Sequence, residues 1–519
     1  MKHMIIYCLI LVIGSISFLS CNSLDLYPED WNSGETFWKN DSQIEGYILG
    51  LHSDLREVYT SFYILGECRG GTLKSGTSFI GTSLDNSSPI KTNMFSKHQT
   101  GVENWNGLYS QILNTNIFIS NVEDGCDFLG EVDRNYYLGQ AYGLRALYYF
   151  LLYRTFGGLP IIDKPYVLEG VTDASNLYAK RSSAKATMDF IKENIRKSET
   201  FFGDNNQMKK EKGMWSKYAT LMLKAEVYLW SAKVSTEDQR PDVSDIQTAR
   251  VALQPIMTTF SLLSNFAEVF QSDNKGNDEI IFAIRFVDGE KTNWINLFVY
   301  DENLFKMQFY GNNKVLMGDT LAVKGSGLLR HEYKWGLFAS MDDSDARKRA
   351  TFLDCYDKDG MPVAVVLRKF MGIINDNGNR SYCDDFVVYR YADALLMMAE
   401  IENMQGGDVA RYINKIRERA YGPNYIVSVH GYKHRSFAEN ELAILKERDK
   451  EFVYEGKRWF DLLRLQDASK KPLAFSADVN YDNSVPVIKP GEAYKLLWPI
   501  DVNTLNNDPE LVNNPGYEN

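Results

Sequence analysis

Three glutamates near the C-terminal end stand at a spacing that brings carboxylates together. Glu447, Glu451 and Glu455 are four residues apart in the segment 443–465, so a helix would place them on one face. Pairs of carboxylates perform acid–base chemistry in glycoside hydrolases, and this is one interpretation. The other is structural, because clustered carboxylates repel one another unless cations lie close. We favour an ionic network that holds one helix against another.

Arginines can supply the cations of such a network. The candidates are Arg448, Arg458 and Arg464 within the segment, and Arg417 and Arg419 before it. Gly456 interrupts the helical periodicity and indicates a kink. If the glutamates are structural, Glu455→Ala should cost folded protein rather than ligand affinity.

The tract 354–360 (DCYDKDG) has the acidic residues and the glycine of a calcium-binding loop. Its ligand spacing fails, however. Placing Asp357, Asp359 and Gly360 at loop positions 3, 5 and 6 leaves Val366 at position 12, where a bidentate glutamate is needed. We therefore predict a β-hairpin turn here.

Other chemistry-bearing motifs are missing from the sequence. The six histidines include His430 and His434, but no HExxH, GxSxG or Walker A sequence occurs. We expect no catalytic residue, no metal site and no cofactor. The net charge of -11 and the lack of a long basic run argue against a nucleic-acid partner.

The first 20 residues have the form of a secretory signal. A short positive end, Lys2 and His3, precedes an apolar stretch that is too short to span a membrane comfortably. The stretch ends in FLSC, which resembles the lipobox of bacterial lipoproteins, and cleavage would leave Cys21 as the acylated first residue. A second interpretation is an ordinary secreted protein that is cut nearby.

Two of the six cysteines, Cys8 and Cys21, lie in the leader, and the other four are far apart and form no CxxC pair. They are Cys68, Cys126, Cys355 and Cys383. Their even number permits disulfides, but we favour isolated buried thiols.

Helical periodicity dominates the elements that must position these residues. The predicted helices cover 105–122, 137–156, 218–232, 394–401 and 409–420. Small residues recur on their apolar stripes and let helices pack closely. The fold class is therefore mainly α, a degenerate tetratricopeptide-like scaffold of helix pairs without a strict period of about 34 residues. We expect a single domain over 21–519, with an N-terminal part to about 270 and a C-terminal helical part from about 386.

The middle part, about 271–385, combines irregular loops with small β-hairpin insertions. Residues 279–287 and 296–300 flank Asp288-Gly289, and residues 352–356 and 361–367 flank Asp359-Gly360. Gly- and Ser-rich loops fill 66–96, and binding residues are often carried on such loops.

Further motifs follow one another in order along the chain. They include Leu144-Arg145-Ala146, Phe156-Gly157-Gly158-Leu159-Pro160, Tyr391-Ala392-Asp393, Glu447-Arg448, Glu455-Gly456, Arg458-Trp459-Phe460-Asp461 and Asn514-Pro515-Gly516-Tyr517. Together with the lipobox they resemble the SusD/RagB family over nearly the whole mature chain.

The resemblance implies a surface protein that is anchored by lipid to the outer membrane and faces the cell exterior. It implies binding of an oligosaccharide or polysaccharide without cleavage, beside a SusC-like, TonB-dependent transporter. Two alternatives stay open: capture of peptides by the same scaffold, and a purely structural role beside the transporter.

Sugar rings present apolar C–H faces, so aromatic side chains can stack on them while polar groups satisfy the hydroxyls. Residue type and loop context select the candidate ligand contacts Arg69, His98, Trp294, Tyr300, Tyr310 and Trp335. Packing in the core is the competing interpretation for each ring. Trp105 and Trp459 fall inside helical motifs, and we assign both to the core.

Overall fold

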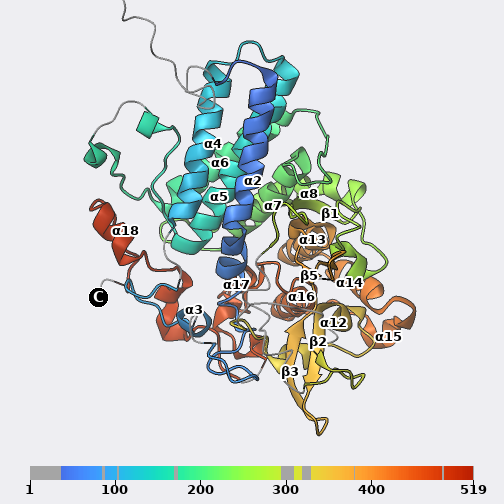
Figure 1. Ribbon diagram of the computed structural model, residues 1–519. Coiled ribbons are helices and arrows are strands. Elements are labelled where there is room, and N and C mark those ends of the chain that lie inside the picture. Colours follow the sequence, from blue (N-terminus) through green and yellow to red (C-terminus); the bar gives the residue numbers. More distant parts are fainter. Residues whose placement is uncertain are drawn as a thin grey trace, which may run out of the picture.

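The computed structural model describes residues 37–84, 88–101, 105–168, 173–293, 309–317, 329–378, 380–481 and 484–517. Helices form most of this part of the chain, with short strand pairs inserted among them (Figure 1). The expectation of a mainly α fold is confirmed. The predicted leader and Cys21 lie outside the described residues.

Long helices pack side by side in the N-terminal half (Figure 1). Helix α5 (Glu131–Phe156) lies between α4 (Asn106–Asp124) and α6 (Ala184–Phe202), and α2 (Asp41–Gly66) packs against α4. Every residue of α5 from Leu138 to Phe156 is buried, so neighbouring elements cover this helix on all sides.

The following helices continue this pairing into the C-terminal half. Helix α7 (Lys217–Lys233) packs against α8 (Asp245–Thr259), and α13 (Tyr391–Gln405) contacts α8, α14 (Ala410–Tyr421) and α16 (Phe437–Glu451). Helix α13 therefore joins the two halves through α8.

The five helices predicted from periodicity all form, although α5 begins at Glu131, earlier than expected. The segment 443–465 is different, because it is not one kinked helix. Helix α16 ends at Glu451 and α17 (Arg458–Arg464) is a separate helix. Gly456 lies between them with a φ of 68°, in the left-handed region that glycine adopts readily.

Among the described residues, three short strand pairs interrupt the helices. Strands β2 (Phe352–Tyr356) and β3 (Pro362–Leu367) form the hairpin predicted around Asp359-Gly360. The side chain of Asp357 accepts the backbone N–H groups of Asp359 and Met361 and so closes the turn, as an Asx turn does. The hairpin interpretation of 354–360 is confirmed.

The partner of strand β1 in the structure is not the segment that the sequence analysis predicted. Strand β1 (Ile280–Ile284) pairs antiparallel with β6 (Phe386–Arg390), about a hundred positions further along. Residues 296–300, the expected partner, lie outside the described residues. A third pair joins β4 (Ile373–Ile374) to β5 (Arg380–Ser381).

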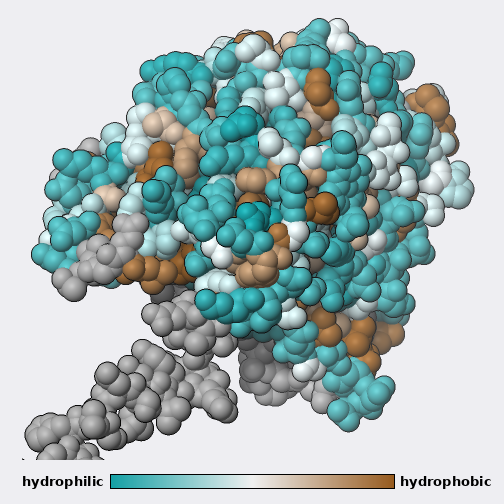
Figure 2. Space-filling view, turned by 90° about the horizontal axis from the view of Figure 1, so that it is seen from above, coloured by the Kyte–Doolittle hydropathy of each residue, from teal (hydrophilic) through white to brown (hydrophobic). Residues whose placement is uncertain are grey.

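Cys68, Cys126, Cys355 and Cys383 are buried free thiols, as predicted. The surface seen from above is mainly hydrophilic, and its apolar residues gather in small separate patches (Figure 2). None of the described helices has the length and apolarity that a membrane crossing requires.

His52 is buried in α2 as a neutral imidazole. Its Nδ1 lies 2.8 Å from the Ile48 carbonyl oxygen, and its Nε2 accepts the backbone N–H of Trp215 at 2.8 Å. Burial lowers the pKa of His52 to about 4, against about 6.5 in the unfolded chain. The unfolded state therefore binds more protons, so this contribution to stability is lost as the pH falls from about 6.5 to about 4.

We expect the stability advantage of the wild type over His52→Gln to shrink by about 2 kcal/mol between about pH 7.5 and about pH 5. Urea unfolding of both proteins at each pH measures it. His98→Gln is the control, because His98 is exposed. An advantage of His52 that does not change with pH would contradict a buried neutral imidazole.

Candidate functional site

The β2–β3 hairpin presents one face that combines aromatic rings with charged groups. Side chains alternate along a strand, so Phe352, Asp354 and Tyr356 of β2 share this face. Helix α11 (Trp335–Ala339) covers it. We call the set Trp335, Phe338, Arg349, Phe352, Asp354 and Tyr356 the aromatic hairpin face.

The rings of this face run from the core to the surface. Phe352 and Phe338 are buried, with ring centroids 6.2 Å apart. Trp335 and Tyr356 are half-buried, and their centroids lie 6.4 Å apart at an interplanar angle of 82°. Trp335 also contacts Phe338 at 5.1 Å. Phe338 therefore holds Trp335, against which Tyr356 packs, and the exposed parts of these two outer rings can meet a ligand without a large ordering cost.

Charged groups lie beside the outer rings. The hydroxyl of Tyr356 donates to Asp354 Oδ2 at 2.6 Å, and Arg349 pairs with the same carboxylate. Burial, and then the hydrogen bond to Asp354, raise the pKa of Tyr356 to about 12, so the phenol stays protonated and donates. Asp354 is buried, but the Arg349 side chain is 40% exposed. The face thus offers apolar ring surface and N–H donors together, which suits a polyhydroxylated ring.

Tyr310 adds to the edge of this hairpin. Its backbone exchanges two hydrogen bonds with Tyr356, at 2.9 and 2.8 Å, and its side chain is half-buried. The neighbouring Phe309 contacts Phe79 at 5.1 Å. Of the six predicted ligand contacts, Tyr310 and Trp335 are therefore brought together around Tyr356, a residue that the sequence analysis did not single out.

The other predicted contacts fall elsewhere. His98 is exposed in the loop before α4. Trp294 and Tyr300 lie outside the described residues.

Arg69 lies in the core, not at a surface that a ligand could reach. Its guanidinium lies 4.0 Å from the ring centroid of Trp459 and 5.0 Å from that of Trp498. Its Nε donates to Asn93 at 2.7 Å, and a second nitrogen donates to the carbonyl of Lys495. Arg69 therefore fastens the C-terminal segment to the N-terminal loops. Trp459 and Trp105 are also buried, which confirms their assignment to the core.

The predicted ionic network of the glutamates is confirmed. Glu447 accepts from Arg417 at 2.8 Å, and Glu451 pairs with Arg419. Burial alone would raise the pKa of Glu447, but the charges of Arg347 and Arg417 lower it to about 2. This carboxylate is therefore ionised and held by cations at neutral pH.

Further cations of the network come from distant segments. Arg390 pairs with Glu451 at 2.7 Å, with Glu455 at 2.8 Å and with Glu279 at 2.7 Å. Lys369 pairs with Glu455 at 2.5 Å. The arginines expected from the same segment bind other carboxylates instead: Arg448 binds Asp393 and Asp461, Arg458 binds Asp449, and Arg464 binds Glu400.

These glutamates are poorly placed for acid–base work. The side chains of Glu447, Glu451 and Glu455 are at most 1% exposed, and each carboxylate contacts at least two cations. The structural interpretation therefore holds for all three.

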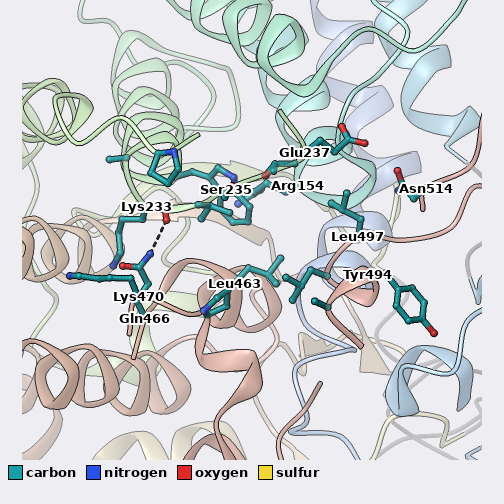
Figure 3. A pocket seen from close by; sticks show the side chains of 18 of the residues that line it. Arg154, Lys233, Ser235, Glu237, Leu463, Gln466, Lys470, Tyr494, Leu497 and Asn514 are labelled. Carbon is teal, nitrogen blue, oxygen red and sulfur yellow. Dashed lines mark hydrogen bonds between the residues drawn. The ribbon is translucent and has the colours of Figure 1, made fainter. Parts of the chain in front are cut away.

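A cavity of about 630 Å³ lies between the end of α7, α17 and the C-terminal segment (Figure 3). Two of its polar side chains are engaged within the protein: Lys233 pairs with Glu400 and Glu441, and Gln466 donates to the Lys233 carbonyl, drawn as a dashed line. Tyr494, 40% exposed, is the ring at its edge. Since the remaining walls are mainly apolar, this cavity suits a sugar less well than the aromatic hairpin face does.

Comparisons of this chain with known proteins all point to a single protein family. The family model described as the SusD family matches residues 172–517, and a second, described as starch-binding and associating with the outer membrane, matches 58–229. A solved SusD superfamily structure from Bacteroides fragilis is 38% identical, covers 93% of this chain and 100% of its own, and has a TM-score of 0.87. SusD-like protein P38 of Formosa agariphila is 24% identical over 98% of both chains. The starch-binding protein SusD of Bacteroides thetaiotaomicron is 27% identical over 31% of this chain and 25% of its own.

Proposed function

The chain belongs to the SusD family, and from this premise we propose that it is a cell-surface protein that captures glycans for a SusC-like, TonB-dependent transporter. The starch-binding and outer-membrane descriptions of the matching model and relative support this proposal. The chain acts by binding, because the family consists of binding proteins, and the transporter carries out the energy-coupled step.

The observation that carries the proposal is the aromatic hairpin face. Trp335 and Tyr356 are half-buried rings held by a buried pair behind them, and Arg349 stands beside them with an exposed side chain. An aromatic surface fixed in advance stacks on the C–H face of a sugar ring, and the guanidinium donates to its hydroxyls. Trp294 and Tyr300 stay proposed contacts on the same grounds of residue type.

The predicted leader, residues 1–20, supports a location at the outer membrane. We propose that residues 1–20 are removed, that Cys21 carries acyl chains in the outer membrane, and that residues 21–519 face the cell exterior as a single domain. More than one acyl chain gives stable anchoring.

The experiment is a binding screen of soluble protein that begins after Cys21, against a panel of purified polysaccharides and oligosaccharides, read by pull-down and calorimetry. Saturable binding of one glycan class is the expected result and names the cargo. If folded protein binds no member of a broad panel, the glycan proposal fails, and peptide capture becomes the next hypothesis to test.

Trp335→Ala should weaken binding of the glycan found in that screen by about tenfold, as expected for an aromatic anchor. Its melting temperature should fall by about 2 °C or less, because the Trp335 side chain is only partly buried. Calorimetric titration and thermal unfolding measure the two effects.

Tyr494→Ala is the matched control, because Tyr494 is an exposed ring at the cavity of about 630 Å³ beside α17 (Figure 3). It should leave the affinity unchanged. Loss of binding in Tyr494→Ala with full binding in Trp335→Ala would move the site to that cavity. A large drop in the melting temperature of Trp335→Ala would instead place Trp335 in the core.

A further inference from the structure

A second cavity, of about 480 Å³, lies next to the aromatic hairpin face. It is bounded by helix α12 (Ala346–Thr351), by the loop after the 3-10 helix at 266–270, and by residues 368–373. Phe270, Met371 and Ile373 give it apolar walls. Its size is within the range of small-molecule sites, and a sugar unit would fit.

Arg368 brings an open positive charge to this cavity. Its side chain is exposed, and among the described residues no carboxylate pairs with it. One nitrogen donates to the Arg349 carbonyl at 3.2 Å, and its own backbone N–H donates to Thr351 at 2.7 Å. A guanidinium has five N–H donors, so the backbone contacts fix Arg368 in place and leave donors for a ligand.

The other charges of the cavity are largely engaged. Lys369 pairs with Glu455, and Arg349 with Asp354. Asp384 is buried, accepts the Gly372 N–H at 2.6 Å, and has a pKa raised by burial. Asp273, which is exposed, is another carboxylate in the lining of the cavity.

The chain as a whole repels anions, since its net charge is -11. Arg368, exposed at this cavity and without a carboxylate partner among the described residues, is therefore a local positive charge on an acidic chain. In such a setting a charge-assisted hydrogen bond to an oxyanion is stronger than a neutral one.

The cavity and the aromatic hairpin face are joined by one carboxylate. Asp354 contacts Arg349, which lines the cavity, and also accepts from the Tyr356 hydroxyl at 2.6 Å. Arg349 therefore belongs to both the aromatic hairpin face and the lining of the cavity.

The wall of the cavity is built from unusual backbone. Phe370 has a φ of 66° and Gly372 a φ of 67°, and a Cβ on Gly372 would lie 1.9 Å from the Ser381 carbonyl oxygen. A bulky residue in the left-handed region costs free energy and is found where the surroundings hold it in place, often at ligand sites.

We propose that this cavity binds the oxyanion of an acidic sugar unit, a carboxylate or a sulfate ester, while neutral units of the same glycan lie on the aromatic hairpin face. The inference rests on the proposed function for the neutral units, but the anion site itself can be tested alone.

The test uses methyl glucoside, methyl glucuronide and glucose 6-sulfate as matched probes, titrated into soluble protein that begins after Cys21. The wild type should bind both charged probes at least about tenfold more tightly than methyl glucoside. Raising the salt from roughly 50 to 500 mM should weaken only the charged probes, since the site is open to solvent. Arg368→Gln should abolish the preference, and Asp273→Asn should strengthen it.

Arg435→Gln is the control, because it removes one arginine charge from an exposed pair with Glu439. It should leave the preference intact. Equal binding of the three probes, or a preference that survives in Arg368→Gln, would overturn the anion site. Binding of one charged probe alone would decide between carboxylate and sulfate. If charged probes bind through Arg368 while no glycan of the panel binds, the anion site stands and the proposed glycan capture fails.

Discussion

Glu455→Ala should lower the free energy of unfolding by about 3–5 kcal/mol, because it leaves buried cations without their carboxylate. Lys369 lies 2.5 Å from one oxygen of Glu455, and Arg390 lies 2.8 Å from the other. The side chains of all three residues are 1% exposed, so water cannot take the place of the carboxylate. Such a loss is a large share of the stability of a typical domain.

Denaturant unfolding and the yield of soluble protein measure this effect. Glu193→Ala is the control, because Glu193 pairs with Arg196 on an exposed helix face, where removal of a pair costs about 0.5 kcal/mol or less. A Glu455→Ala protein that is stable and well expressed but no longer binds ligand would refute the structural role and give the carboxylate a functional one.

The same network shows how far sequence reasoning reaches. The four-residue spacing of Glu447, Glu451 and Glu455 predicts that cations must be near, and Arg417 and Arg419 are found there. Another cation, Arg390, is the last residue of strand β6 and reaches the glutamates only through the tertiary fold. Nothing in its local sequence marks it, because spacing reports neighbours on one element and not between elements.

Strand pairing shows the same difference between contacts that are close in sequence and contacts that are distant in sequence. The β2–β3 hairpin could be predicted, since its Asp-Gly turn and its two strands are adjacent in sequence. The partner of β1 could not, because β6 lies about a hundred positions away and both strands are buried, so neither shows the alternation that identifies a half-exposed strand.

The candidate site was predicted in part. Trp335 and Tyr310 were chosen for residue type and loop context, and both lie around Tyr356. Tyr356 itself carried a usable signal, since it stands two residues after Asp354 and four after Phe352 on one strand face. Arg69 satisfied the same criteria of type and context, yet its loop is covered by residues 495–498 from the far end of the chain. Loop context alone does not reveal which loops a distant segment buries.

The break between α16 and α17 depends on the close approach of the intervening turn to the end of α2. The sequence indicated this break only through Gly456. Glu67, just after α2, accepts the backbone N–H groups of Tyr454 and Gly456 at 2.8 and 3.0 Å and the Tyr333 hydroxyl at 2.7 Å. A buried carboxylate thus fastens the turn to the end of α2. Gly456 is needed here for two reasons, its left-handed backbone and the lack of room for a side chain.

Gly456→Ala should therefore cost at least about 3 kcal/mol, the sum of a left-handed alanine and an overlap with backbone. Its Cβ would lie 2.4 Å from the Phe62 carbonyl oxygen, which the rest of α2 holds in place. Gly406→Ala separates the two terms, because Gly406 has a φ of 72° and no atom within 4 Å of the added Cβ. It should lose only about 1 kcal/mol in the same urea unfolding experiment. Equal losses in the two variants would mean that α2 and the turn yield to the methyl group, and that Gly456 is required for its backbone conformation alone.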